Sequence, residues 1–279
     1  MNDQMNQNCN QGVPTPILIS GAARSGTSLV AGCIHLCGAF GGHLSGPTKN
    51  NQKGMYENTY IREGIVKPYL RSINVDPLGQ YPLPDVTKLP IPADWKQRIE
   101  NVFLSEGYKS GPIFYKGAKS VLLWPIWYYA FPNAKWVIVR RRTGDIVRSC
   151  LNTGFMRAFR NPDHQRAVGV NNEADGWKWW VRQHELRFVE MITEGLNCQI
   201  VWPERMVDGD YRQLYETIEW LGLKWNSDVL SFIDPKLWKS RNKYNPANAK
   251  LARDIKDKVG AFIDGTGAIE QEEVTSGEM

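Results

Sequence analysis

The sequence predicts an α/β fold in which helices cover both faces of a parallel β-sheet, giving three layers. Four short apolar runs are each followed by a longer segment with helical periodicity. Alternating strands and helices indicate parallel strands joined by crossover helices. The 279 residues are 42% hydrophobic and 23% charged, which suits one generous globular domain and excludes a fibrous or mostly disordered protein.

The strands and helices can be placed in chain order. Residues 16–21 form an apolar run that ends in Gly21, and the helix after it carries Leu29, Val30, Cys33, Ile34 and Cys37 at helical spacing. The later pairs of strand and helix are 112–116 with 124–131, 136–140 with 144–152, and 198–202 with 211–221.

Other segments are predicted from their composition. An apolar stripe over 177–191 indicates a further helix with a core face. Prolines recur through residues 77–92, which predicts a surface loop or flap. Residues 1–14 and 260–279 are expected to be flexible tails, leaving a single domain over 15–259.

The charge balance points to an anionic ligand. The net charge is +5, and residues 264–279 hold five acids and no base, so the remainder carries +10. These basic residues are spread out and lack the dense runs of a nucleic-acid groove, so no nucleic-acid partner is expected.

The cysteines and the apolar runs bear on the compartment. Five cysteines without paired spacing argue against a disulfide framework or a zinc site. No apolar run approaches about 18 residues and no leader is recognisable, so we expect no membrane insertion and a cytoplasmic location.

The loop after the first strand has the glycine spacing of a phosphate-binding loop. It reads Gly21-Ala-Ala-Arg-Ser-Gly-Thr-Ser28 and lies between a strand and a helix, where such a loop belongs. Thr27 replaces the usual lysine, and Arg24 precedes the second glycine. The loop amides and the hydroxyls of Thr27 and Ser28 could hold an oxyanion, with Arg24 supplying charge. The alternative is a tight turn without a ligand.

Further cations follow the later strands. Lys116 ends the second strand, and Arg140, Arg141 and Arg142 end the third. Ligands of such sheets bind at this carboxyl edge. No strand-end acid is well placed to hold Mg²⁺, so a multiply anionic ligand bound without a metal is expected.

With these residues in view, the chain resembles the sulfotransferases that use 3′-phosphoadenosine 5′-phosphosulfate (PAPS), in particular the bacterial type with its P-loop fold. Residues 21–29 resemble the family's 5′-phosphosulfate loop, with Arg24, Ser25, Gly26, Thr27 and Ser28 at the matching positions and Gly21 before them. Residues 137–149 resemble its 3′-phosphate segment, in which a strand-end arginine and a serine eight residues later bind the phosphate.

Arg141 and Ser149 keep that spacing. An arginine leaving a strand and a serine on the next helix can converge on one phosphate without any analogy. The alternative for Arg141 and Ser149 is a solvated cation and a surface hydroxyl. Asp145, near the start of the same helix, is expected to act as a cap.

Residues 53–58 resemble a third family segment and supply the candidate base, Glu57. Asn58 could equally cap the helix that follows. Where cytosolic members carry a catalytic histidine, this chain has Lys119. Lys116, Lys119 and Arg24 are therefore the expected catalytic cations. The histidines are weaker candidates for the base: His35 and His184 as core residues, His43 and His164 in loops.

The resemblance implies transfer of a sulfuryl group from PAPS to a hydroxyl or amine of a small molecule, glycan or peptide, releasing adenosine 3′,5′-bisphosphate. Two departures matter: Leu29 stands where cytosolic members stack a tryptophan on adenine, and residues 238–241 match the late basic element only loosely. A P-loop kinase using ATP and a non-catalytic nucleotide-binding protein of the same fold are the alternatives. The acceptor and the oligomeric state stay open.

Overall fold

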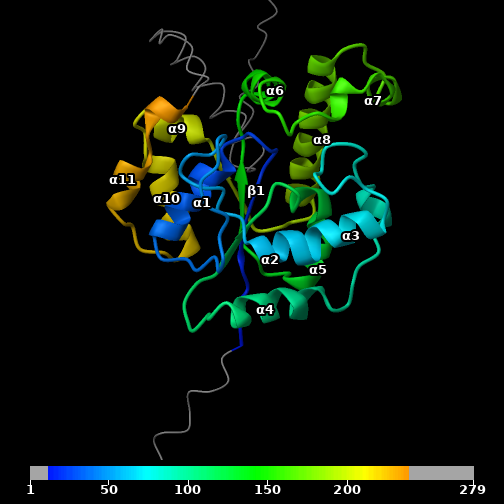
Figure 1. Ribbon diagram of the computed structural model, residues 1–279. Coiled ribbons are helices and arrows are strands. Elements are labelled where there is room, and N and C mark those ends of the chain that lie inside the picture. Colours follow the sequence, from blue (N-terminus) through cyan, green and yellow to red (C-terminus); the bar gives the residue numbers. More distant parts are fainter. Residues whose placement is uncertain (1–11, 239–279) are drawn as a thin grey trace, which may run out of the picture. The chain divides into compact units, whose positions relative to one another are not determined.

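The strands expected from the sequence form one parallel sheet in the order β2-β1-β3-β4 in the computed structural model, which describes residues 12–238 (Figure 1). Ile19 of β1 lies opposite Lys116 of β2 on one side and Val137 of β3 on the other. The ends of the three strands therefore meet at one edge. The strand bounds are β1 (Ile17–Ser20), β2 (Phe114–Lys116), β3 (Trp136–Val139) and β4 (Cys198–Val201).

Side chains alternate between the two faces of each strand, and both faces are covered. Ile17 and Ile19 pack into a core shared with α1 (Thr27–Leu36), α10 (Arg212–Leu221) and α11 (Asp228–Phe232). Tyr115 faces the other way and stacks on Trp127 of α5 (Trp124–Ala130), with ring centroids 5.0 Å apart. Helices α6 (Thr143–Leu151) and α8 (Glu173–Thr193) lie on this second side (Figure 1). The predicted three-layer α/β fold is confirmed.

The remaining helical elements connect these layers. Helix α4 carries Trp95, Ile99 and Phe103 on its buried face at i, i+4 and i+8. This helix was not predicted from the sequence. The connecting helices are α2 (Thr59–Ile61), α3 (Lys67–Ser72), α4 (Trp95–Ser105), α7 (Pro162–Ala167) and α9 (Pro203–Val207). A π-helical turn spans Arg62–Val66, and short 3₁₀ turns span Val86–Lys88, Val121–Leu123, Ala158–Arg160 and Pro235–Leu237.

The proline-rich segment is a loop, as predicted, and it is fastened to its surroundings. Its one regular element is the 3₁₀ turn at Val86–Lys88. Gln80 is buried, donates from Nε2 to the carbonyl of Phe155 (2.7 Å) and accepts from the amide of Arg157 (3.0 Å). The ring of Tyr81 lies 4.8 Å from that of His164. A role as a flap over a ligand stays a prediction.

The domain boundaries stay a prediction. Residues 12–238 belong to one compact unit. The expected boundary at 259, the tail from 260 and most of the tail before 15 lie outside the described residues. Between residues 12 and 238, no helix has the length and apolar character needed to cross a membrane.

Candidate active site at the carboxyl edge of the sheet

The loop between β1 and α1 closes tightly against neighbouring strands. A Cβ on Gly21 would lie 2.4 Å from the carbonyl oxygen of Val139, so the backbones approach as only glycine permits. Gly26 has φ of 101° and Arg24 has φ of 74°, both in the left-handed region. These angles turn the chain so that α1 begins at Thr27. The hydroxyl of Ser25 is buried and has no hydrogen-bond partner within residues 12–238.

Arg24 turns back towards α6 and meets the second predicted phosphate segment. Its Nε donates to Ser149 Oγ over 3.0 Å. Arg141 donates from Nη1 to the carbonyl oxygen of Arg24 over 2.7 Å, and its guanidinium lies 4.2 Å from the ring of Trp238. Burial lowers the pKa of both arginines, although an arginine remains protonated at any physiological pH. The structure thus brings Arg24, Arg141 and Ser149 into one cluster, the arginine clamp.

The other two arginines at the end of β3, Arg140 and Arg142, form ion pairs with acidic residues of the protein. Arg140 pairs with Glu185 of α8 at 2.6 Å and stacks over Trp202 at 4.8 Å. Arg142 binds Asp145 through Nε (2.8 Å) and Nη2 (2.7 Å). The expectation that Asp145 caps its helix is wrong, because its hydrogen bonds go to this side chain. Among these three arginines, Arg141 is the one that contacts the loop between β1 and α1.

Glu57, Lys116 and Arg62 form a second cluster, the carboxylate cluster, beside the clamp. Glu57 and Lys116 are buried, and Lys116 Nζ donates to Glu57 Oε1 over 3.0 Å. Arg62 Nη1 donates to the other oxygen, Oε2, over 3.0 Å. Burial raises the pKa of Glu57, but the attraction of Lys116, Lys119 and Arg62 outweighs it and brings this pKa to about 2. The carboxylate is therefore ionised, with a cation on each oxygen.

The π-helical turn at Arg62–Val66 positions the outer part of this cluster. Arg62 also donates from Nε to Glu63 (2.8 Å), which in turn pairs with Lys67 at 2.7 Å. Ser45 accepts from Arg62 Nη1 (3.1 Å) and donates to the carbonyl of Glu57 (3.0 Å). Opposite charges alternate from Lys116 to the surface at Lys67. Turns of this type are frequent at functional sites.

Lys119 lies near the carboxylate cluster without an ion pair in the described part of the chain. It is half-buried on the turn after β2, and its Cγ would be 3.3 Å from a Cβ on Gly79 in the proline-rich loop. Its charge contributes to the low pKa of Glu57. Burial and the neighbouring cations lower the pKa of Lys119, while Glu57 raises it.

The start of α1 and residues 53–58 are joined directly. Ser28 Oγ donates to the carbonyl of Met55 over 3.1 Å, so one expected ligand-binding hydroxyl is engaged by the protein. Asn58 caps α2 by accepting from the amide of Ile61 over 2.9 Å. His184 is buried and its Nδ1 contacts the carbonyl of Trp180, which fits its expected place in the core.

Sequence reasoning missed the roles of Arg62 and Ser45 and left Trp238 open. Arg62 follows the last residue of α2, five positions after Glu57, and nothing in the sequence marks the two as partners. The ring of Trp238 would lie 3.0 Å from a Cβ on Gly26, so it covers the loop as well as Arg141. The sequence indicated Trp238 only because residues 238–241 loosely match the late basic element of the resembled family.

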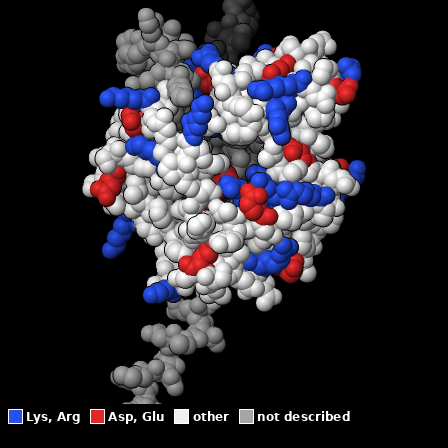
Figure 2. Space-filling model, viewed as in Figure 1, with Lys and Arg blue, Asp and Glu red and all other residues white. Residues whose placement is uncertain are grey.

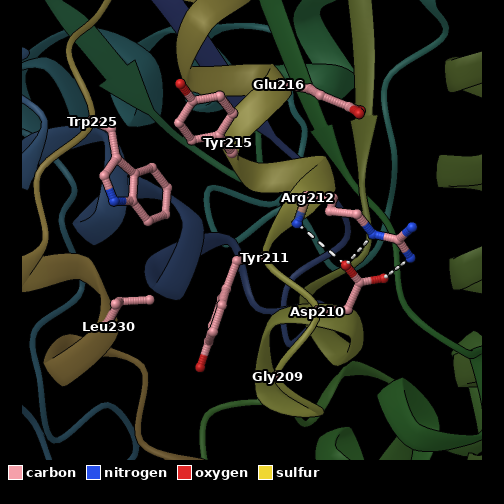
Figure 3. A pocket seen from close by; sticks show the side chains of 8 residues that line it. All are labelled: Gly209, Asp210, Tyr211, Arg212, Tyr215, Glu216, Trp225 and Leu230. Carbon is pink, nitrogen blue, oxygen red and sulfur yellow. Dashed lines mark hydrogen bonds and ion pairs between the residues drawn. The ribbon is translucent and has the colours of Figure 1, made fainter.

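Figure 2 shows Lys and Arg side chains, with Asp and Glu side chains among them, in the middle of the face drawn. A separate hollow of about 710 Å³, drawn in Figure 3, contains none of the predicted site residues. It is lined by Gly209, Asp210, Tyr211, Arg212, Tyr215, Glu216, Trp225 and Leu230.

Comparisons with known proteins bear on the fold. No protein-family model and no curated protein matches the chain. Among solved structures it is similar to the sulfotransferase domain from the curacin biosynthetic pathway, with a TM-score of 0.50 and 14% identity over 88% of this chain and 99% of that one. It is also similar to a sulfotransferase from Alicyclobacillus acidocaldarius, with a TM-score of 0.48 and 13% identity over 92% of this chain and 98% of that one. At such identities a likeness establishes the fold alone: the chain has the fold of the curacin-pathway domain.

Proposed function

We propose that the protein transfers a sulfuryl group from PAPS to a hydroxyl or amine of an acceptor and releases adenosine 3′,5′-bisphosphate. The observation that carries this proposal is the arginine clamp. Two guanidiniums and one hydroxyl, from the first loop, the end of β3 and helix α6, converge beside the turn at Gly26. Such a set suits a ligand with more than one phosphate, because guanidinium groups bind phosphate oxygens in forked pairs.

Each residue has a task in this proposal. The loop from Gly21 to Ser28, with the amides at the start of α1, faces the 5′-phosphosulfate, and the buried Ser25 hydroxyl is a donor without a partner among residues 12–238. Arg141 and Ser149 bind the 3′-phosphate. Arg24 joins the two ends, since its backbone belongs to the loop and its side chain contacts Ser149.

The carboxylate cluster would serve the acceptor and the charge that develops during transfer. Lys116 is held at the edge of β2 by Glu57, and its strand neighbours β1, which leads into the loop. Preorganised cations of this kind stabilise charge that appears in the transition state. The acceptor's proton needs a basic group, and the two candidates are Glu57 in this cluster and Lys119 near it.

Calorimetric titration with adenosine 3′,5′-bisphosphate and with ATP and Mg²⁺ tests the donor. We expect the bisphosphate to bind without a metal and more tightly than ATP. A preference for ATP with Mg²⁺ would instead support the kinase alternative.

Incubation with PAPS and a library of acceptors, with bisphosphate release as the readout, tests the reaction. Tight bisphosphate binding without release for any acceptor would favour a non-catalytic nucleotide-binding protein.

A further inference from the structure

A second hollow, of about 400 Å³, lies where helix α5 meets the end of α8 and the end of the proline-rich loop. The side chains of Trp124, Tyr128 and Tyr129 line it from α5, with two prolines beside them. Ile91 comes from the proline-rich loop, and Glu194 is the residue that caps the end of α8. Clefts of this size hold small molecules. We call this site the aromatic hollow.

The aromatic hollow is distinct from the arginine clamp and the carboxylate cluster and shares no residue with them. Pro132, which lines it, lies shortly before β3 begins, and Glu194 lies shortly before β4 begins. These two strands are parallel, so they begin at the same edge of the sheet. The hollow therefore belongs to the amino edge, whereas the candidate active site lies at the carboxyl edge.

The wall of the aromatic hollow is held by contacts inside the protein. Trp124 Nε1 donates to Glu190 Oε2 of α8 over 3.4 Å, and Glu190 also pairs with Arg187 at 2.7 Å. The end of the proline-rich loop is fastened as well, because the carbonyl of Pro90 accepts from the hydroxyl of Tyr69 over 2.7 Å. The elements that form the hollow are thus fixed to one another without a ligand.

The aromatic side chains of the hollow are open to solvent. Tyr129 is 66% exposed and Tyr128 is 38% exposed, although Trp127 of the same helix is fully buried. Exposed apolar side chains that gather in one place mark interaction sites. The face of an aromatic ring carries negative charge, so it attracts a cation.

The charge at the aromatic hollow favours a cation too. Of the described residues that line it, Glu194 alone is charged, and its side chain has no ion pair within residues 12–238. Helix α8 ends here after 21 residues, without a basic residue in its last turn. The carboxyl end of a helix carries partial negative charge, which a nearby cation stabilises. The ring faces, the carboxylate and the helix end therefore favour the same sign of ligand.

We propose that the aromatic hollow binds a small organic cation with an alkylated ammonium group. A primary ammonium has three N–H donors, and Glu194 is the one carboxylate in the lining that the structure describes. A quaternary ammonium has no N–H to satisfy. Its methyl groups can pack on the rings and on Ile91, with its charge near Glu194. The assignment does not depend on the proposed function.

Fluorine NMR of the full chain, labelled with fluorinated tyrosine, tests the site directly. The signals of Tyr128 and Tyr129 are assigned by their loss in Tyr128→Phe and Tyr129→Phe. Choline is titrated at constant ionic strength. Its neutral control is 3,3-dimethylbutanol, which has the same shape with carbon in place of the charged nitrogen.

We expect choline to shift both signals until they saturate. Tyr60, an exposed tyrosine outside the hollow, should not shift. Choline should bind about 2- to 30-fold more tightly than its neutral control, the usual range for a cation on aromatic faces. No saturable shift with choline overturns the site, and equal affinity of the neutral control overturns the choice of a cation.

Substitutions separate the contributions of ring and charge. Tyr129→Leu removes an aromatic face and Glu194→Gln removes the charge, so each should weaken choline binding about 2- to 5-fold, followed at the Tyr128 signal. Tyr129→Phe keeps the face and should bind choline like the parent. Glu216→Gln, which changes an acid of the other hollow, should leave the affinity unchanged. Urea unfolding checks that each variant is folded. Parent-like affinity in both Tyr129→Leu and Glu194→Gln overturns the proposal.

Further probes decide the kind of cation. Ethanolamine has the chain of choline with a primary ammonium, and we expect it to bind more weakly; equal affinity overturns the alkylated group. A peptide with trimethyllysine and vesicles of phosphatidylcholine carry the same head group on a larger partner. We expect neither to bind more tightly than choline, and tighter binding of either overturns the assignment to a small molecule.

Discussion

Arg24 of the phosphate-binding loop donates from Nε to Ser149 Oγ of α6 over 3.0 Å, although 125 residues separate them in the chain. The resemblance placed these residues at opposite ends of the nucleotide. Their direct contact means that one side chain links the loop before α1 to helix α6. If the proposed function is right, a phosphate bound at Ser149 would also affect the loop at the other end of the nucleotide.

Replacing Arg24 tests this connection. We expect Arg24→Ala to reduce turnover about 10²- to 10³-fold, because the proposed site loses the charged side chain that links the loop to Ser149. Arg24→Gly removes the same side chain, but glycine suits the left-handed backbone at φ of 74°. Its free energy of unfolding should therefore be about 1 kcal/mol higher than that of Arg24→Ala. Steady-state kinetics and urea denaturation measure the two effects. Turnover within a few-fold of the parent in both variants would remove Arg24 from the site.

Much of the fold was predictable because its strands are buried on both faces and its helices bear strong stripes. Every predicted strand is present, and α10 ends at Gly222 in the left-handed conformation, as the glycine indicates. The misses have local causes. Helix α4 begins only three residues after Pro92. The prolines before it predicted a loop, so the apolar stripe that begins at Trp95 was not recognised as a helix.

The buried ion pairs of Glu57 predict a specific acid sensitivity. Its folded pKa of about 2 lies below the ordinary 4.5, so the ionised group stabilises the fold above pH 4.5, and this contribution disappears as the pH falls from 4.5 towards 2. The shift corresponds to about 3 kcal/mol. Urea unfolding of the parent and of Glu57→Gln should differ most near neutral pH and converge towards pH 2. A difference that does not change between pH 6 and pH 3 would contradict the assignment.

The site was less predictable than the fold, because its side-chain partners depend on backbone geometry. Glu57 and Lys116 are 59 positions apart, and isolated bridges of Phe40 with Ile113 and of Leu44 with Asn58 connect the segment before α2 to the segment of β2. Arg62 reaches Glu57 from the end of α2, and no local signal in the sequence pairs the two residues. By contrast, Arg141 and Ser149 lie on one strand-helix unit, and their spacing was readable in the sequence.

Gly21 offers a stability test of the phosphate-binding loop with a matched control. Gly21→Ala places a Cβ 2.4 Å from the Val139 carbonyl and 2.7 Å from Ser25 Oγ, so the backbone must shift. We expect a loss of about 1–3 kcal/mol together with weaker bisphosphate binding. Gly144→Ala, in the first turn of α6 with no atom within 4 Å of the new Cβ, should be neutral or slightly stabilising. Equal effects of the two substitutions in denaturation curves would show that the loop tolerates a side chain.

Arg140 and Arg141 are adjacent in sequence, yet the structure gives them separable tasks. Arg141 contacts the carbonyl of Arg24, so Arg141→Ala should weaken bisphosphate binding by about 1.5–3 kcal/mol, the usual contribution of a charged hydrogen bond, which is roughly 10- to 150-fold in Kd. Arg140 pairs with Glu185 and stacks on Trp202, so Arg140→Ala should lower the free energy of unfolding and change the Kd only a few-fold. Calorimetric titration and urea unfolding of both variants give the comparison. If Arg140→Ala weakened binding as much as Arg141→Ala, both arginines would have to contribute to phosphate binding. The arginine clamp would then include Arg140.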